Sequence, residues 1–354
     1  MNTEKKNQHF VPKLYLRNFS IRQEGKQLAV FNTQSDQWIP NASLKGQAQK
    51  NFFYGKDGKI EDRLGETENE VAPLLRKITF ENYVPLPGSD DHLRVLHFLM
   101  LTHLRNPVNT NDITSRPPML NEHIKKISGN EVGIDPAQMT THDEAIQMAF
   151  KHLPQAVAIS KDLRLKLMIN TTKSPFITSD NPVILYNQFM EMRKWPLSGT
   201  GIANVGLQIF MPLTPTVMLI TYDDMTYKIG DKKKNIVNLK QAGEVDQLNT
   251  LQLLNCDRNL FGNEKLTKDY LVNLKARATR FTKANTPTMK EVELHTGQGV
   301  RQIINSSSTE CRISLSLSAV NQTKAAKRFV FSTKAVHVRE RTKAVLTLLH
   351  GPGW

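Results

Sequence analysis

The chain has 354 residues, of which 39% are hydrophobic and 23% are charged, a balance typical of an ordinary globular protein. This excludes a collagen-like, a coiled-coil and a wholly disordered chain. The formal net charge of +14 favours anionic partners, and two cysteines are too few for a disulfide framework or a four-cysteine zinc site. The chain starts without an apolar signal segment and contains no run of about 20 apolar residues, so we expect a cytosolic (cytoplasmic) protein without a membrane span.

The first part of the chain predicts a hairpin followed by a helix. Two short extended runs, at residues 27–32 and 36–39, flank a polar turn, which is typical of a β-hairpin. Apolar residues then recur with a 3.6-residue period over residues 61–78, which indicates a helix. Pro73 lies inside this stretch, so we expect a kink or two shorter helices.

Two further helices are predicted on either side of a Pro-rich stretch. The pattern over residues 91–104 favours a helix that ends before an Asn-Pro pair. Residues 107–140 are rich in Pro and Asn, and Pro117 and Pro118 lack the backbone N–H that a helix needs. We therefore expect an insertion without a continuous helix there. Helical periodicity returns over residues 143–160.

After residue 160 the pattern changes to short runs of β-forming residues separated by turns, and helices are expected again near residues 236–255 and 267–284. This order favours the α+β class, with one mostly antiparallel sheet and several surrounding helices. We expect a single domain over residues 1–296. The predicted strands are residues 167–169, 176–178, 183–186, 207–211 and 217–221.

The last segment differs in composition from the rest. Between Arg301 and Trp354, nine basic residues stand against two acidic ones, which places half of the net charge in this stretch. The stretch is also rich in Ser and Thr and has no long helical period. We expect residues 297–354 to form a separate basic tail with little ordered structure.

Several motifs occur in a recognisable order. Gln8-His-Phe-Val-Pro12 precedes Leu14-Tyr-Leu-Arg-Asn-Phe19, and Phe98-Leu-Met-Leu-Thr-His-Leu-Arg105 follows later. Phe176-Ile-Thr-Ser-Asp-Asn-Pro-Val183 then precedes Pro212-Leu-Thr-Pro215. Over about residues 7–285 these motifs resemble an uncharacterised bacterial family, domain of unknown function 4238. His103 departs from the pattern, which has a glutamine-like residue there. The resemblance implies one coherent domain and no defined chemistry.

The first motif contains three candidate catalytic residues, His9, Tyr15 and Arg17. They have the same parity, so an extended segment would place them on one face. An imidazole and a phenol can carry out acid–base chemistry on a phosphodiester while a guanidinium neutralises the developing charge. In the structural alternative, His9 caps a turn before Pro12, Tyr15 belongs to the core and Arg17 pairs with an acid.

A second group of candidates lies near a predicted strand end. Asn181 precedes Pro182 and is therefore disfavoured in the α conformation, which places Ser179 and Asp180 where binding groups are common. We assign Asp180 a catalytic role and Ser179 and Asn181 substrate-binding roles. Arg105, at a predicted helix C-terminus, is a further anion contact. The alternative is an Asx-type turn in which Asp180 accepts hydrogen bonds from backbone amides.

No motif indicates a cofactor or a metal. His92, His97 and His103 are five and six residues apart on one predicted helix, whereas two metal ligands on one face need a spacing of four. Glu66 and Glu70 have that spacing and could share a divalent cation, but a solvated acidic face explains them as well.

Three functional interpretations are consistent with these patterns. The first is a nucleic-acid-acting protein, a nuclease-like effector that hydrolyses phosphodiester bonds with the His, Tyr, Arg and Asp candidates. The second is a non-catalytic module that binds nucleic acid or a protein, and the third is an enzyme on a small anionic substrate. Candidate side chains that meet in one cleft favour an enzyme, whereas scattered ones favour a binding module.

Overall fold

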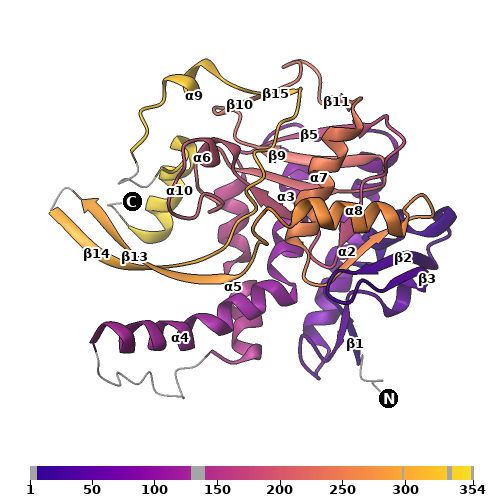
Figure 1. The fold of residues 1–354 in the computed structure, drawn as a ribbon, viewed down its shortest axis with the longest axis horizontal. Coiled ribbons are helices and arrows are strands. Elements are labelled where there is room, and N and C mark those ends of the chain that lie inside the picture. Colours follow the sequence, from indigo (N-terminus) through magenta and orange to yellow (C-terminus); the bar gives the residue numbers. More distant parts are fainter. Residues whose placement is uncertain (1–5, 129–139, 297–298, 333–336, 352–354) are drawn as a thin grey trace.

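The structure, a computed structural model, describes residues 6–128, 140–296, 299–332 and 337–351. Its helices and strands confirm the α+β class (Figure 1). The strands are mostly antiparallel, as predicted, but they divide among several sheets. In the described part of the chain, no helix is long and apolar enough to span a membrane.

The elements are numbered in chain order, and Figure 1 labels many of them. The helices are α1 (Lys13–Leu16), α2 (Lys59–Phe80), α3 (Asp90–Leu104), α4 (Pro107–Ser128), α5 (His142–Ser160), α6 (Gln188–Met192), α7 (Ala242–Asn255), α8 (Lys268–Ala278), α9 (Lys324–Arg328) and α10 (Glu340–His350). The strands are β1 (Asn7–His9), β2 (Gln27–Asn32), β3 (Trp38–Ser43), β4 (Gln49–Asn51), β5 (Arg164–Asn170), β6 (Thr178–Ser179), β7 (Ile184–Tyr186), β8 (Gln208–Pro212), β9 (Val217–Tyr222), β10 (Tyr227–Ile229), β11 (Ile236–Leu239), β12 (Asn259–Gly262), β13 (Pro287–Thr296), β14 (Gly299–Ser308) and β15 (Val320–Gln322).

The largest sheet has five strands in the order β11-β5-β9-β8-β7, and only β11 and β5 run parallel. Its strands are apolar on both faces. Leu167 and Leu219 belong to a core shared with α2, α3 and α5, whereas Met168 and Ile220 belong to a second core shared with α7 and α8. Burial on both faces explains why these strands are continuous apolar runs in the sequence.

The second sheet has the order β3-β2-β12-β6 and is antiparallel throughout. It confirms the predicted hairpin, because β2 pairs with β3. Strand β12 pairs with β2 on one side and with β6 on the other. The start of the chain is thereby joined to two segments, β12 and β6, that are far away in the sequence.

Most helix predictions were right, but α8 ends at Ala278 instead of residue 284, and the predictions also failed at the prolines and in the β11 region. Helix α2 continues through Pro73 without a break, and α3 and α5 match their predicted ranges. Residues 236–239 form strand β11, so the helix predicted from residue 236 begins only at α7.

The expectation of an insertion without a continuous helix after residue 107 was wrong, because α4 runs through Pro117 and Pro118. A proline inside a helix costs about 3 kcal/mol, so tertiary contacts must offset that cost. Helix α4 packs against β13. Arg116 Nη1 donates to the carbonyl of Ser306 at 3.0 Å, and Ser308 Oγ donates to Asp112 Oδ1 at 2.5 Å.

The described residues of 297–354 contain regular structure, unlike the tail that was expected. Strand β15 pairs with β10, and Arg339 pairs with Asp162 at 2.9 Å. Along residues 311–317 every second side chain is buried in the second core, namely Cys311, Ile313, Leu315 and Leu317. Burial along the segment therefore alternates with a period of two, and Ser314, with φ of 54°, interrupts its extended backbone. The proposed domain boundary at residue 296 stays a prediction.

Candidate functional site

The segment that carries His9, Tyr15 and Arg17 is not extended, so that prediction was wrong. Strand β1 ends at His9, helix α1 follows, and Arg17 begins a turn of 3₁₀ helix. In this short helical stretch Tyr15 is buried and Arg17 is exposed. The three side chains consequently do not share one face.

Tyr15 is held inside the protein by two hydrogen bonds. Its hydroxyl donates to the carbonyl of Pro212 at 2.5 Å and lies 2.6 Å from Thr178 Oγ1. Burial raises the pKa of this phenol above its ordinary value of 10. The neutral hydroxyl therefore links three of the motifs, because Thr178 and Pro212 belong to the two later ones.

Asp180 likewise connects distant segments. Its carboxylate accepts hydrogen bonds from the backbone N–H groups of Asp257, Arg258 and Asn259, at 2.8, 2.9 and 2.8 Å. Burial nevertheless raises its pKa to about 6. The alternative in which Asp180 satisfies backbone amides agrees with this geometry, although the amides are 77 to 79 residues away in sequence. Ser179 is also engaged, since its Oγ accepts from Gln252 Nε2 at 2.5 Å.

His9 and Arg105 lie close together in the interior. The side chain of Arg105 is 1% exposed, and its Nη2 donates to Glu68 Oε1 at 2.8 Å. Tyr54 donates its hydroxyl to the carbonyl of Arg105 at 2.9 Å. His9 Nε2 donates to the carbonyl of Lys45 at 3.2 Å. Burial, and then the charges of Lys13 and Arg105, lower the pKa of His9 to about 4, so its imidazole is neutral near pH 7.

Arg105 retains donors that no described residue accepts. Its Nε and Nη1 are buried and make no hydrogen bond with the described part of the chain. A buried guanidinium in this state binds water or an anion in many proteins. Arg105 lines neither of the two pockets characterised below.

Asn181 belongs to a chain of buried amides at the end of α3. Its Oδ1 accepts from Asn106 Nδ2 at 3.0 Å, and its Nδ2 donates to the carbonyl of Asn255 at 3.0 Å. These bonds fix the loop between β6 and β7 against α3 and α7. Asn181 is thus placed at the wall of a pocket of about 300 Å³.

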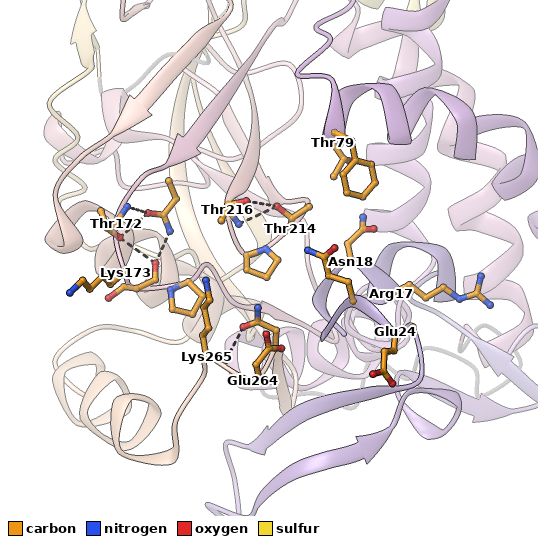
Figure 2. A pocket seen from close by; sticks show the side chains of 18 residues that line it. Arg17, Asn18, Glu24, Thr79, Thr172, Lys173, Thr214, Thr216, Glu264 and Lys265 are labelled. Atoms are coloured by element: carbon orange, nitrogen blue, oxygen red, sulfur yellow. Dashed lines mark hydrogen bonds between the residues drawn. The ribbon is translucent and has the colours of Figure 1, made fainter. Parts of the chain in front are cut away.

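Arg17 lies in a different and larger pocket of about 670 Å³ (Figure 2). A 3₁₀ turn supplies Arg17 and Asn18, the end of α2 supplies Phe80, and the loops after β5 and β12 supply the opposite wall. Asn18 Nδ2 donates to the carbonyl of Leu213 at 3.1 Å, which fixes the turn against the β8–β9 connection. We call this the Arg17 pocket; its lining includes Arg17, Asn18, Phe80, Thr172, Lys173 and Lys265.

Positive charges at the Arg17 pocket outnumber negative ones. Arg17, Lys173 and Lys265 are exposed and form no ion pair with any residue in the described ranges. Two carboxylates, Glu24 and Glu264, also line the pocket. The backbone N–H of Arg22 donates to Glu264 at 2.9 Å and lowers the pKa of that carboxyl. Figure 2 shows Arg17 and Lys173 on opposite sides of the pocket, with their charged ends turned outward.

Sequence reasoning identified Arg17 but missed its neighbours in the pocket. Phe80 ends helix α2, beyond the predicted range of residues 61–78, and is 65% exposed. Lys173 and Lys265 lie in polar turns that look like any solvated loop. No pattern in the sequence shows that these turns are neighbours in space.

The candidate residues do not gather around one pocket. Arg17 lines the larger pocket and Asn181 the smaller one, whereas His9, Tyr15, Ser179 and Asp180 line neither. The catalytic and binding roles assigned from the sequence stay predictions. Within the residues that the structure describes, no group of three or more His, Cys, Asp or Glu side chains is arranged to hold a metal ion.

Comparison with known proteins identifies the family of this chain. The family described as "Protein of unknown function (DUF4238)" matches residues 7–266. The chain belongs to the DUF4238 family. This confirms the resemblance seen in the motifs. A search of curated proteins and a search of solved structures each found no match. The whole Arg17 pocket, from Arg17 to Lys265, falls within the DUF4238 match.

Proposed function

We propose that the chain binds single-stranded nucleic acid across the Arg17 pocket. The observation that carries this proposal is the combination, around one groove, of an exposed aromatic ring with three cations that form no ion pair within the described part of the chain. Proteins that bind single strands without strict sequence preference combine these two features: cations follow the phosphates, and aromatic rings stack on the bases.

The cations are suited to contact successive phosphates. Arg17 and Lys173 flank the groove, and Lys265 lies in the loop after β12. Arg76 and Lys77 are exposed one turn before Phe80 and add to the positive charge on this side. The two carboxylates in the pocket oppose this attraction locally, whereas the overall charge of +14 supports it at longer range.

Phe80 supplies a platform for a base. Its ring is 65% exposed at the end of α2, although a phenylalanine of an amphipathic helix is usually packed in the core. Stacking of a base on an aromatic side chain contributes about 1–3 kcal/mol and tolerates every base. Asn18 and Thr172 add polar side chains to the lining of the groove.

The scatter of the catalytic candidates favours binding over hydrolysis. Tyr15 and Asp180 use their polar atoms in buried hydrogen bonds, and neither lines the pocket. Of the three interpretations drawn from the sequence, the non-catalytic nucleic-acid module therefore agrees best with the positions of these residues.

Fluorescence anisotropy with labelled 12-mers of single-stranded RNA, single-stranded DNA and duplex DNA tests the proposal. The variant Arg17→Ala, Lys173→Ala, Lys265→Ala should bind single strands at least about tenfold more weakly at 50 mM salt. A matched control removes three exposed lysines elsewhere, Lys151, Lys161 and Lys240, and should bind nearly as the wild type.

Phe80→Ala gives an independent result, with a loss of about 1–3 kcal/mol for single strands and little change for duplex. If the pocket and control triple variants lose the same affinity for single strands, binding depends on diffuse positive charge and not on the Arg17 pocket. No binding of any strand at 50 mM salt would remove the proposal.

A further inference from the structure

The pocket of about 300 Å³ at the end of α3 is a separate site, which we call the His103 pocket. Its size falls near the lower end of the range for small-molecule sites. The walls come from the C-terminal end of α3, the first turns of α4, the loop after β6, the end of α7 and the base of β14. The lining includes His103, Asn106, Asp112, Arg116, Asn181 and Glu310.

The charged side chains in the walls already have hydrogen-bond partners. Arg116 Nε and Nη2 both donate to Asp112 Oδ2, at 3.0 and 2.5 Å. Glu310 Oε1 accepts from Ser198 Oγ at 2.6 Å and from the backbone N–H of Thr200 at 2.9 Å. An incoming anion would meet two carboxylates and a guanidinium that is already occupied. The walls therefore disfavour a phosphate or a carboxylate ligand.

The amides of the wall are locked by one another. Asn106 donates to Asn181 at 3.0 Å, and Asn285 Nδ2 donates to Asn255 Oδ1 at 3.1 Å. Asn255 Nδ2 in turn donates to the carbonyl of Asn181 at 2.8 Å. A network of this kind holds the pocket in one shape before any ligand enters, which lowers the cost of binding.

His103 also lines the pocket, but its side chain takes no part in this amide network. Its Nδ1 is buried and makes no hydrogen bond with the described residues, and the ring lines the pocket. Burial lowers the pKa of His103 to about 4, and the nearby charge of Asp112 offsets this only in part. The imidazole is neutral near pH 7, so one ring nitrogen donates and the other accepts.

We propose that the His103 pocket binds a neutral, hydroxyl-bearing small molecule through His103, either a free sugar or the sugar of a nucleoside. A hydroxyl both donates and accepts a hydrogen bond, so it suits either tautomer of the imidazole. An apolar ligand would form no hydrogen bond with the imidazole that lines the pocket, which is unfavourable. The two carboxylates of the walls, Asp112 and Glu310, disfavour the phosphorylated forms of the same molecules.

Isothermal titration of the full chain tests this, with ribose and glucose in one arm, uridine and adenosine in the second, and UMP and AMP in the third. Binding of a member of either neutral arm, at least tenfold tighter than the mononucleotides, supports the proposal, and the arm that binds identifies the source of the sugar. Absence of measurable heat from all four neutral compounds at millimolar concentration, or tighter binding of the mononucleotides, overturns it.

Variants test whether the ligand binds in the His103 pocket. His103→Ala should weaken binding at least tenfold, whereas His97→Ala, a half-buried histidine of the same helix that does not line the pocket, should leave it unchanged. Val108→Trp fills the pocket without removing a side-chain hydrogen bond and should abolish binding even if His103→Ala does not fold. Binding that survives both substitutions would overturn the assignment. The triple variant of the Arg17 pocket should retain this binding, so the two proposals can fail separately.

Discussion

Truncation of Leu315 tests whether the last part of the chain belongs to the core. Leu315 is 2% exposed and packs in the second core, in a segment whose composition predicts a loose tail. Leu315→Ala keeps the backbone bonds, in which its N–H donates to Tyr186 at 3.0 Å and its carbonyl accepts from Gln188 at 2.5 Å. Only apolar burial is lost. A buried Leu→Ala substitution costs about 2–5 kcal/mol, and an extended segment at the edge of a core can partly relax, so we predict a loss of about 2–3 kcal/mol.

Urea unfolding followed by circular dichroism measures this change. The control is Ser316→Ala, because the side chain of Ser316 is exposed, and such a substitution shifts stability by less than about 0.5 kcal/mol. If Leu315→Ala unfolds at the same urea concentration as Ser316→Ala, the segment contributes no core packing and the reasoning is refuted.

Three further outcomes follow from buried polar groups, each measured by urea unfolding. Tyr15→Phe should cost about 1–2 kcal/mol, because it removes the hydroxyl between Thr178 and Pro212; an unchanged midpoint would contradict that role. Asp180→Ala should cost about 3 kcal/mol or more, because it leaves three backbone N–H groups without their acceptor, and a smaller loss than that of Tyr15→Phe would argue against it. Stability should fall as the pH drops from 6.5 to 4, because an unfolded chain takes up protons that His9 and His103, each with a pKa of about 4, do not take up when folded. The double variant His9→Gln, His103→Gln should lose less stability between pH 6.5 and 4 than the wild type does. An identical loss would contradict this explanation.

Much of the fold was predictable from local patterns. Helix α3 follows from periodicity, which reports which side of a helix is buried. The hairpin of β2 and β3 and the strands of the large sheet other than β11 follow from short runs of β-forming residues between turns. The errors arose where tertiary contacts outweighed a local sequence preference. Proline disfavours a helix by itself, yet the base of the β13–β14 hairpin holds α4 together around Pro117 and Pro118.

The tail shows the opposite kind of error. Residues 311–317 alternate between apolar and polar side chains, which is a strand-like pattern and was visible in the sequence. The basic, Ser-rich composition outweighed it in the prediction. Composition averages over a segment, whereas burial depends on where its few apolar residues are placed.

The candidate site was less predictable than the fold. Residue type marked Tyr15 and Asp180 as reactive, but their hydrogen-bond partners are 163 and 77 residues away in sequence, where no local pattern could show them. The Arg17 pocket is built from turns that become neighbours only after β2, β12 and β6 pair. Its aromatic member, Phe80, differs from a core phenylalanine only in its exposure.

The salt dependence of single-strand binding tests the central claim most directly. For single strands the slope of log affinity against log salt is about −0.7 per phosphate contacted. If Arg17, Lys173 and Lys265 each contact one phosphate, their replacement by alanine should make the slope shallower by about 2, and the Lys151, Lys161, Lys240 control should leave it unchanged. An unchanged slope in the pocket variant would contradict the assignment of nucleic-acid binding to the Arg17 pocket.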